Sequence, residues 1–365
     1  MTSTGQIRPV EAGDLVELIR LKREQGDVNG SWAARFDWQF ARNPFREDGR
    51  PIGWVLDAGG GRLGGHQMAM PHRFQVLGTE QYVGISMDTF AHSDYRGAGI
   101  GRRLFEAYFE AQAGGLAVAT TANNISEHIW LKADAIYLGD LNIAYLYPFR
   151  SASLVGNLVA GRLRRLPAKR LLSSLAGMPL DVVAKLRQPR LGTGTRVERV
   201  SADDAVLDEI WTRYRDQYRI TNVRDARYRR WRYIDCPEPQ PSLHLVTDSL
   251  TGAQGWFALK TKERGKDYPI QVCDVVDIFG PVEDARFQRQ VISAALIAAR
   301  ETGADCMEFA GGHPSWRQHL RGLGFLRRTL PSNGFLCKNM SEIAQAALMP
   351  ADAWHLVRAD GDAAL

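Results

Sequence analysis

The stretch from Tyr95 to Leu104, YRGAGIGRRL, places three glycines and three arginines just before a segment of helical character. Glycine adopts backbone conformations with positive φ, so such a loop can turn several backbone N–H groups toward one point. The start of a helix adds a partial positive charge, which favours an anion. The stretch predicts a strand-to-helix turn, and two interpretations stay open: a plain tight turn, or a site for a phosphate group.

The spacing of the glycines separates this loop from two familiar nucleotide-binding motifs. Gly97, Gly99 and Gly101 form G-x-G-x-G, whereas the dinucleotide-binding fingerprint requires G-x-G-x-x-G and an acid about 20 residues further on. The next strand carries no acid at its end, and the P-loop pattern G-x-x-x-x-G-K-[ST] does not occur in the sequence. What the loop does contain is R-x-x-G-x-G, formed by Arg96, Gly99 and Gly101.

This motif, after a strand and before a helix, resembles the pyrophosphate-binding motif of the GNAT acyltransferase superfamily. The resemblance implies acetyl-CoA or another acyl-CoA as co-substrate, with the loop amides on the pyrophosphate and the preceding strand beside the pantetheine arm. It implies no metal. The segments FDWQFARNP, GGHQMAMPHRFQV, MDTFAHSDYRGAGIG and TTANN resemble a bacterial branch of that superfamily with tandem domains. The cofactor-binding residues that the resemblance implies are Phe90, Ala91, His92, Arg96, Gly97, Ala98, Gly99, Ile100, Gly101 and Arg102.

The second half of the sequence repeats features of the first. RFDWQFARNP resembles RRWRYIDCP, which aligns Trp38 with Trp231, 193 residues later. SMDTFAH resembles VVDIFGP, which aligns Asp88 with Asp277, 189 residues later. Two matches at similar offsets indicate a tandem repeat of one fold. The second half has PVEDARFQRQ in place of the glycine loop, with acids and no glycine, so we expect it to bind no CoA.

Alternating strand and helix signals predict an α/β protein (α+β mixed sheet): a GNAT fold in tandem, with two central mixed β-sheets flanked by helices. The elements expected around the loop are strands at 53–57, 63–70, 82–92, 116–121 and 136–147, and helices at 8–26, 102–113 and 125–133. The regions expected are an acyl-CoA-binding catalytic domain (1–150), a basic helical linker (151–192), a degenerate GNAT-like domain (193–345) and a C-terminal tail (346–365).

Acyl transfer to an amine requires a base for the ammonium and a donor for the oxyanion, and it benefits from an acid for the thiolate. In the family a strand carboxylate commonly acts as base, which makes Asp88 the leading candidate. A structural role for Asp88 has equal weight, because Asp277 stands at the same place in the half without the loop. His66, His72 and His92 are weaker candidates, since each fits a surface or packing role as well.

The acid is where the sequence departs from the family. Asn124 is a candidate catalytic residue because the similar branch has an asparagine there, although helix capping explains it too. The family pattern places a tyrosine seven residues after the asparagine, where this sequence has Trp130 or Leu131. Either Tyr137, the nearest phenol and one expected in or near a strand, replaces that acid, or the thiolate leaves without a protein acid.

Composition sets the broad class. The chain has 365 residues, 45% of them hydrophobic and 24% charged, as in a soluble globular protein with room for two domains. It has no apolar run of about 18 residues, so no transmembrane segment is expected. The N-terminal sequence lacks the apolar core of a signal peptide, which favours a cytoplasmic location. Four cysteines without C-x-x-C spacing predict neither a disulfide framework nor a zinc site.

Residues 150–190 contain nine arginines and lysines and a single acid. This segment is interpreted as a linker packed on the domains, or as a docking surface for an acidic partner such as an acyl carrier protein. No aromatic residues are interleaved with its basic ones, so no nucleic-acid partner is expected. A homo-oligomer remains an open alternative.

These features together predict an acyl-CoA-dependent N-acyltransferase. The expected reaction moves acetyl from acetyl-CoA to a primary amine of a small molecule, by direct attack in a ternary complex. An amino sugar, a nucleotide sugar or another metabolite fits as acceptor. Two alternatives stay open: an N-acyltransferase that takes longer acyl chains from an acyl carrier protein, and a CoA-binding scaffold without turnover.

Overall fold

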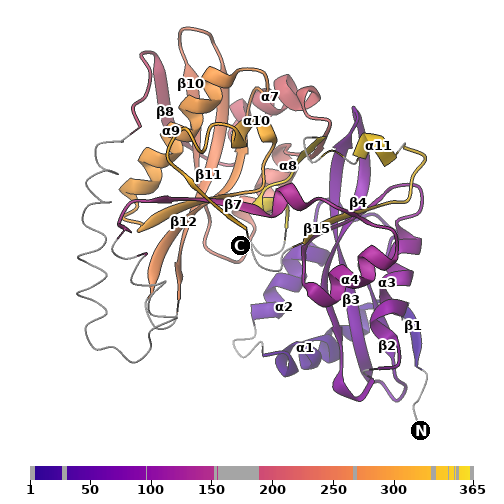
Figure 1. Ribbon diagram of the computed structural model, residues 1–365. Helices are drawn as coiled ribbons and strands as arrows, with labels where there is room; N and C mark the ends of the chain where they lie inside the picture. Colours follow the sequence, from indigo (N-terminus) through magenta and orange to yellow (C-terminus); the bar gives the residue numbers. More distant parts are fainter. Residues whose placement is uncertain are drawn as a thin grey trace, which may run out of the picture.

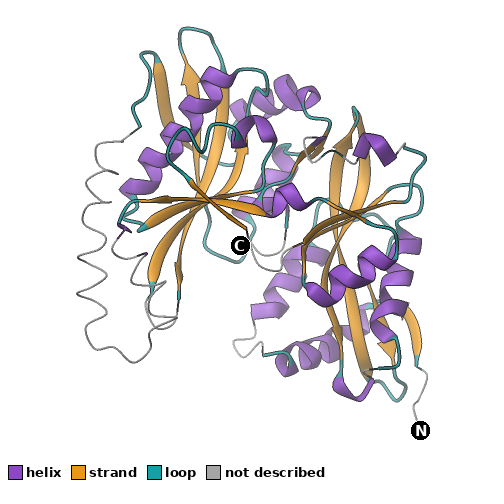
Figure 2. Ribbon diagram, in the orientation of Figure 1, coloured by secondary structure: helices purple, strands orange, loops and turns teal. Residues whose placement is uncertain are grey.

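A computed structural model describes residues 5–26, 31–95, 97–151, 154, 189–265, 269–329, 334–343, 345–348, 350 and 353–361. Two central β-sheets, each flanked by helices, make up this part of the chain (Figure 1; Figure 2). Each sheet contains parallel and antiparallel neighbours, so both are mixed. The predicted fold class, a mixed α/β protein with two mixed sheets flanked by helices, is confirmed.

The first sheet has the strand order β1-β2-β3-β4-β5-β15-β6, with β9 beside β3 and β16 beside β9. Only the β4–β5 and β9–β16 pairs in it are parallel among the strands described. Its strands are β1 (Gln6–Pro9), β2 (Gly53–Asp57), β3 (Leu63–Val76), β4 (Thr79–Ala91), β5 (Leu116–Ala122), β6 (Ile136–Tyr137), β9 (Ile220–Asn222), β15 (Gly334–Asn339) and β16 (Trp354–His355).

The second sheet has the order β14-β7-β13-β12-β11-β10-β8, with β12 and β13 parallel. Its strands are β7 (Ile143–Pro148), β8 (Thr195–Val200), β10 (Ser242–Asp248), β11 (Gln254–Arg264), β12 (Ile270–Phe279), β13 (Cys306–Ala310) and β14 (Leu326–Thr329). In both sheets a parallel pair is joined through a long helix, α3 in the first and α9 in the second, as a crossover requires.

The helices cover the faces of the two sheets (Figure 2). They are α1 (Leu15–Glu24), α2 (Ser31–Phe36), α3 (Ile100–Ala111), α4 (Asn124–Lys132), α7 (Ala205–Tyr214), α8 (Ala226–Arg229), α9 (Ala285–Glu301), α10 (Pro314–Arg317) and α11 (Gln345–Leu348). Short 3-10 turns occupy Ala12–Asp14, Ser93–Tyr95, Gly139–Asn142, Arg215–Gln217 and Arg358–Asp360, and π-helical turns occupy Asp37–Ala41 and Arg230–Ile234.

Helix α3 shows why the loop sequence is followed by a helix. Its apolar side chains recur at helical spacing, so they form one stripe that faces the sheet. Tyr108 fixes the register further, because its hydroxyl donates to the Gly84 carbonyl of β4 at 2.6 Å. The buried residues of the stripe are Ile100, Leu104, Phe105, Tyr108 and Phe109.

The sequence prediction placed several boundaries wrongly. The strand expected at 136–147 is two strands, β6 and β7, which lie in different sheets, and the strand expected at 63–70 continues to Val76. The helix expected at 8–26 begins at Leu15, because residues 6–9 form the edge strand β1. Gln6 lies opposite Asp57 and Pro9 opposite Trp54 in an antiparallel pair with β2. Proline has no N–H to donate, and an edge strand tolerates it.

The two sheets exchange strands. β7 follows the first half of the sequence but lies between β13 and β14 of the second sheet, whereas β15 lies between β5 and β6 of the first. β9 also pairs with β3, Ile220 opposite Val76. The division at residues 150, 192 and 345 rests on composition and stays a prediction; the topology adds that neither sheet comes from one continuous segment.

Trp38 and Trp231, aligned in the sequence, are in direct contact in the structure. Each lies in a π-helical turn, and each indole Nε1 donates to the other residue's backbone carbonyl at 2.8 Å. Their rings stack with centroids 5.0 Å apart. The two residues therefore have equivalent environments, and their pair joins the two halves in one hydrophobic core.

Candidate active site

The parallel strands β4 and β5 separate at the loop end of the first sheet. They pair only at Ile85–Val118 and Ser86–Ala119, although β4 continues to Ala91. A cavity of about 180 Å³ opens where they part. Its lining residues are Ser86, Met87, Asp88, Thr89, Phe105, Ala119, Thr121, Ala122, Asn123, Ser126 and Trp130.

Asp88 enters this lining through a β-bulge. The pairing of β3 with β4 shifts between His66 and Met68, and Asp88 takes the positive φ of 56°. A bulge re-aims the side chains beside it, and aspartate tolerates the left-handed region better than most residues. Backbone strain of this kind often accompanies a functional position.

The Asp88 carboxylate is held by groups from three other elements. Trp32 of α2 donates its Nε1 to Oδ2 at 2.9 Å, and Lys22 of α1 forms an ion pair with Oδ1. His66 Nε2 lies 3.7 Å from Oδ2. Burial raises the pKa of Asp88, but His66 and the Lys22 ammonium outweigh burial and hold it well below its usual range. Asp88 is therefore a carboxylate at neutral pH.

The wall of the cavity along β4 is ordered by a buried glutamine. Gln67 Nε2 donates to Ser86 Oγ and to the Met68 carbonyl, each at 2.8 Å. Thr89 donates its hydroxyl to Gln67 Oε1. Gln67 thus links Ser86 and Thr89, which flank Asp88 in the strand, and fixes their hydroxyls at the cavity.

The glycine loop ends at the start of α3. Gly97 and Gly99 have φ of 83° and 70°, and a Cβ at either would meet no atom within 4 Å. Backbone conformation, not crowding, requires glycine there. Gly99 is the N-cap of α3 and offers no side chain to the first turn. The N–H groups of that turn have no acceptor within the helix, as suits an anion.

The remaining predicted loop residues have distinct surroundings. Arg96 lies outside the described residues. Ala98 is exposed, and Ile100 is buried as the first residue of α3. Gly101 faces α4, with a hypothetical Cβ 3.7 Å from Ile129. Arg102 pairs with Glu106 at 2.7 Å and is 77% exposed, as on a solvated helix face.

Phe90, Ala91 and His92 lie on the approach to the loop. Ala91 pairs with Gly65 of β3 on one side, while the side of β4 toward β5 is unpaired beyond Ser86. An extended ligand can therefore pair with this backbone. His92 Nε2 lies 3.3 Å from Glu24 Oε2.

The two asparagines before α4 have different places. Asn123 lines the cavity and caps the helix, its Oδ1 accepting from the N–H groups of Ile125 and Ser126 at 3.0 Å. Asn124 is the exposed first residue of α4 and does not line the cavity. The capping interpretation thus describes Asn123, and Asn124 is its neighbour.

Tyr137 is not brought together with Asp88. It lies in β6, as expected of a strand residue, three strands from β4. Strands about 4.8 Å apart put roughly 14 Å between them. Trp130 lines the cavity instead, and its ring is buried against Phe109 at a centroid distance of 5.0 Å. Among the described lining residues Asp88 alone is ionisable, and none has a phenol.

Lys22, Trp32 and Gln67 belong to this site although the sequence pattern did not point to them. They come from α1, α2 and β3, and they join the site through side-chain contacts with Asp88 or with Ser86 and Thr89 beside it. No motif marks them, because a lysine or tryptophan at helical spacing looks the same whether it serves a site or the surface.

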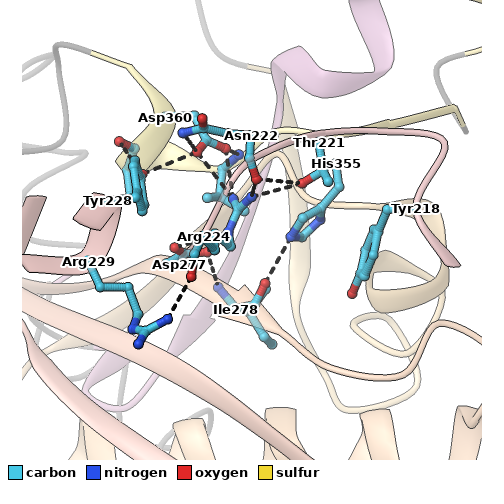
Figure 3. Close-up of polar contacts among 12 residues, drawn as sticks. Tyr218, Thr221, Asn222, Arg224, Tyr228, Arg229, Asp277, Ile278, His355 and Asp360 are labelled. Atoms are coloured by element: carbon cyan, nitrogen blue, oxygen red, sulfur yellow. Dashed lines mark hydrogen bonds and ion pairs between the residues drawn. The ribbon is translucent and has the colours of Figure 1, made fainter. Parts of the chain in front are cut away.

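The second half closes the equivalent position. Asp284 caps α9 by accepting from the Phe287 N–H at 2.9 Å. Asp277 is fully buried and accepts a hydrogen bond from the Tyr233 hydroxyl at 2.6 Å. It also pairs with Arg224 at 3.1 Å (Figure 3). Burial raises the pKa of Asp277 to about 6 against the opposing effect of Arg224. The aligned aspartate there is part of a packed core.

Three general features bear on the site. In the described part of the chain no group of three or more His, Cys, Asp or Glu side chains could hold a metal ion. No described helix is long and apolar enough to cross a bilayer. The four cysteines are buried and form no disulfide.

Solved structures resemble the chain along most of its length. A probable N-acyltransferase of Enterococcus faecalis V583 superposes with a TM-score of 0.59 at 10% identity, covering 93% of this chain and 73% of that one. Saccharomyces cerevisiae N-myristoyltransferase with bound myristoyl-CoA superposes with a TM-score of 0.55 at 13% identity, covering 92% of this chain and 78% of that one. A GCN5-related N-acetyltransferase of Kribbella flavida superposes with a TM-score of 0.53 at 14% identity, covering 92% of this chain and 72% of that one.

These likenesses show the fold: the described part of the chain has the mixed α/β fold of these N-acyltransferase and N-acetyltransferase structures. No family model matches the chain, and no curated protein matches it in sequence.

Proposed function

We propose that the chain is an acyl-CoA-dependent N-acyltransferase that moves acetyl from acetyl-CoA to a primary amine of a small molecule. The observation that carries the proposal is one constellation: a helix start capped by Gly99, an unpaired length of β4, and a cavity with an anionic Asp88 between parted strands. The acyl-CoA structure of the yeast relative and the N-acyltransferase fold support it.

The loop and strand would hold the co-substrate. The first-turn amides of α3 bind the pyrophosphate, and the free side of β4 beyond Ser86 pairs with the pantetheine amides. Both contacts use backbone groups, so they tolerate variation in side chains. They lead from the exposed loop to the cavity, where the thioester is placed.

Asp88 acts chiefly through its charge. A carboxylate whose pKa is lowered is a weak base, so direct removal of the amine's proton is not its main contribution. The carboxylate attracts and orients the acceptor as it approaches, and the proton leaves through water. The amine nitrogen forms a bond to the thioester carbon, the C–S bond breaks, and the thiolate departs.

The cavity favours a short acyl group. Its volume of about 180 Å³ is below the roughly 300 Å³ at which ligand pockets usually begin. Phe105 and Trp130 form an aromatic part of its lining, and Trp130 is fully buried, so a longer chain would have to displace packed rings. Because none of the described residues that line the cavity has a phenol, we infer that the thiolate leaves without a protein acid.

The test is release of free thiol from acetyl-CoA across a panel of amines. Gly99→Asp should reduce acetyl-CoA binding at least about a hundredfold, because its carboxylate would occupy the N-cap and repel the pyrophosphate. Gly60→Asp is the matched control: it makes the same change at an exposed glycine with φ of 62°, in the β2–β3 turn. If the Gly99→Asp variant bound acetyl-CoA as tightly as the unsubstituted chain, the site assignment would be wrong.

Two other functions are separated by the same experiment. CoA binding without thiol release on any amine favours a scaffold without turnover, a reading that the lack of a phenol in the described lining supports. Turnover only with a loaded acyl carrier protein favours longer chains from that donor. The partner segment expected for it, 150–190, lies largely outside the described residues.

A further inference from the structure

A second pocket, of about 500 Å³, lies in the second half and shares no residue with the cavity between β4 and β5. Arg289 and Ser293 project into it from one face of α9, because they are four residues apart. The turn from Arg321 to Gly324, after α10, forms another wall. The segment entering β8 completes it. The lining residues are Pro189, Arg190, Arg289, Ser293, Arg321, Gly322, Leu323 and Gly324.

The pocket has a one-sided charge. Three of its residues are arginines, which stay protonated at any physiological pH, and none of those described is acidic. Within the described ranges, no carboxylate lies at ion-pair distance from Arg190, Arg289 or Arg321. Arg224 and Arg264, by contrast, both pair with carboxylates. Like charges gathered in a hollow create a positive potential that an anion relieves.

The positive charge of Arg289 lies beside the turn from Arg321 to Gly324. A Cβ at Gly322 would lie 3.6 Å from a terminal nitrogen of Arg289, so the guanidinium rests against this glycine. The pKa of His319, which lies just before this turn, is lowered by burial and then by the positive charge of Arg289. The exposed Arg289 side chain therefore lies beside this turn, where its charge faces the pocket.

We propose that this pocket binds a small polyanion of the phosphate class, such as the phosphate or diphosphate group of a metabolite. Guanidinium groups present paired N–H donors that match phosphate oxygens, and several of them around one hollow suit more than one negative charge. The concave shape and the volume fit a small molecule better than the flat face of an acidic protein.

The experiment is calorimetric titration of the full chain with pyrophosphate and with inorganic phosphate, at constant ionic strength. The Gly99→Asp chain serves as background, so that the α3 loop does not contribute. Saturable binding at one site is expected. Arg289→Gln combined with Arg321→Gln should weaken it at least about tenfold, because two charged donors are lost.

Arg286→Gln is the matched control, since Arg286 is an exposed arginine of the same helix outside the pocket lining. It should change the affinity less than twofold. The proposal would be overturned if neither anion bound saturably, or if the double variant bound them as tightly as the background chain. It would also be overturned if the chain bound an acidic protein but bound neither pyrophosphate nor phosphate. The result is independent of the proposed reaction, which is tested with acetyl-CoA on the unsubstituted chain.

Discussion

Helices α3 and α9 start at equivalent points of the two halves, yet only one start is open. α3 follows Gly99, which has no side chain to cap the first turn, in an exposed loop. α9 follows Asp284, whose own carboxylate takes the Phe287 N–H. A helix that caps itself with a carboxylate has filled the place where an external anion would sit. In the proposed function, the identity of the cap thus decides whether this point of the fold can bind an anion.

The two aligned aspartates differ in the same way. Asp88 is 14% exposed, lines a cavity and has one lysine as its ion-pair partner. Asp277 is fully buried, and its partner Arg224 also binds Asp360 at 2.9 Å, near the end of the chain (Figure 3). One carboxylate faces a space that a ligand can enter, and the other fastens the C-terminal segment to the core.

The largest effect is expected from a substitution in the second half, where Asp277 is buried in the core. Arg224→Ala leaves Asp277 and Asp360 buried without their cation, and loss of one partner of a buried ion pair costs about 3–5 kcal/mol. The free energy of unfolding in urea measures it. Arg227→Ala is the control, because Arg227 is 63% exposed and its ion pair is with nearby Asp225; it should lose less than about 1 kcal/mol. Equal losses in both variants would contradict the structural role.

In the first half, a substitution of the aligned aspartate, Asp88, should affect catalysis more than stability. Asp88→Asn removes the anionic charge from the cavity, and we expect kcat/KM to fall about 10- to 100-fold while acetyl-CoA affinity changes little. Steady-state kinetics with equilibrium CoA binding measures both. Loss of CoA binding together with activity would show that Asp88 supports the fold of the loop instead.

The pH dependence of stability sharpens the role of Asp88. Its folded pKa is below the unfolded value of about 3.9, so its contribution is fully present above that pH and is lost as pH falls through the folded pKa. The difference in unfolding free energy between the unsubstituted chain and Asp88→Asn should therefore shrink below about pH 4. Chemical denaturation at a series of pH values tests this; a constant difference down to pH 2 would contradict it.

The smallest effect is expected at the closed helix start. Asp284→Ala removes the cap of α9 and should cost about 0.5–2 kcal/mol of unfolding free energy, with no effect on acetyl-CoA affinity. Thermal unfolding and CoA titration check the two statements. A gain of a second CoA site in this variant would show that the carboxylate alone keeps the second half closed.

Local sequence predicted the elements of the first half well, because their signals are local. The glycines of YRGAGIG fix a turn through their own φ values, and the apolar spacing of α3 determines which face is buried. The alignment of Trp38 with Trp231 was visible since both turns use the same residue types. β1 was missed because four residues with a proline carry too weak a strand signal.

The site was predicted only in part, for a related reason. Asp88 was found because it lies on the strand before the loop, but its partners Lys22 and Trp32 come from other elements. The exchange of β7 and β15 between the sheets depends on contacts between distant residues, such as Leu336 opposite Ala119. No local pattern encodes which of the two sheets a strand joins.

The sequence was enough to predict an anion-binding loop in the first half and its absence from the second, because backbone freedom and capping are properties of single residues and their neighbours. Only the tertiary structure decided that Tyr137 lies away from the cavity, that Trp130 lines it, and that the pKa of Asp88 is lowered while that of Asp277 is raised. Those properties depend on burial and on charges brought from remote segments, so they arise when the chain packs.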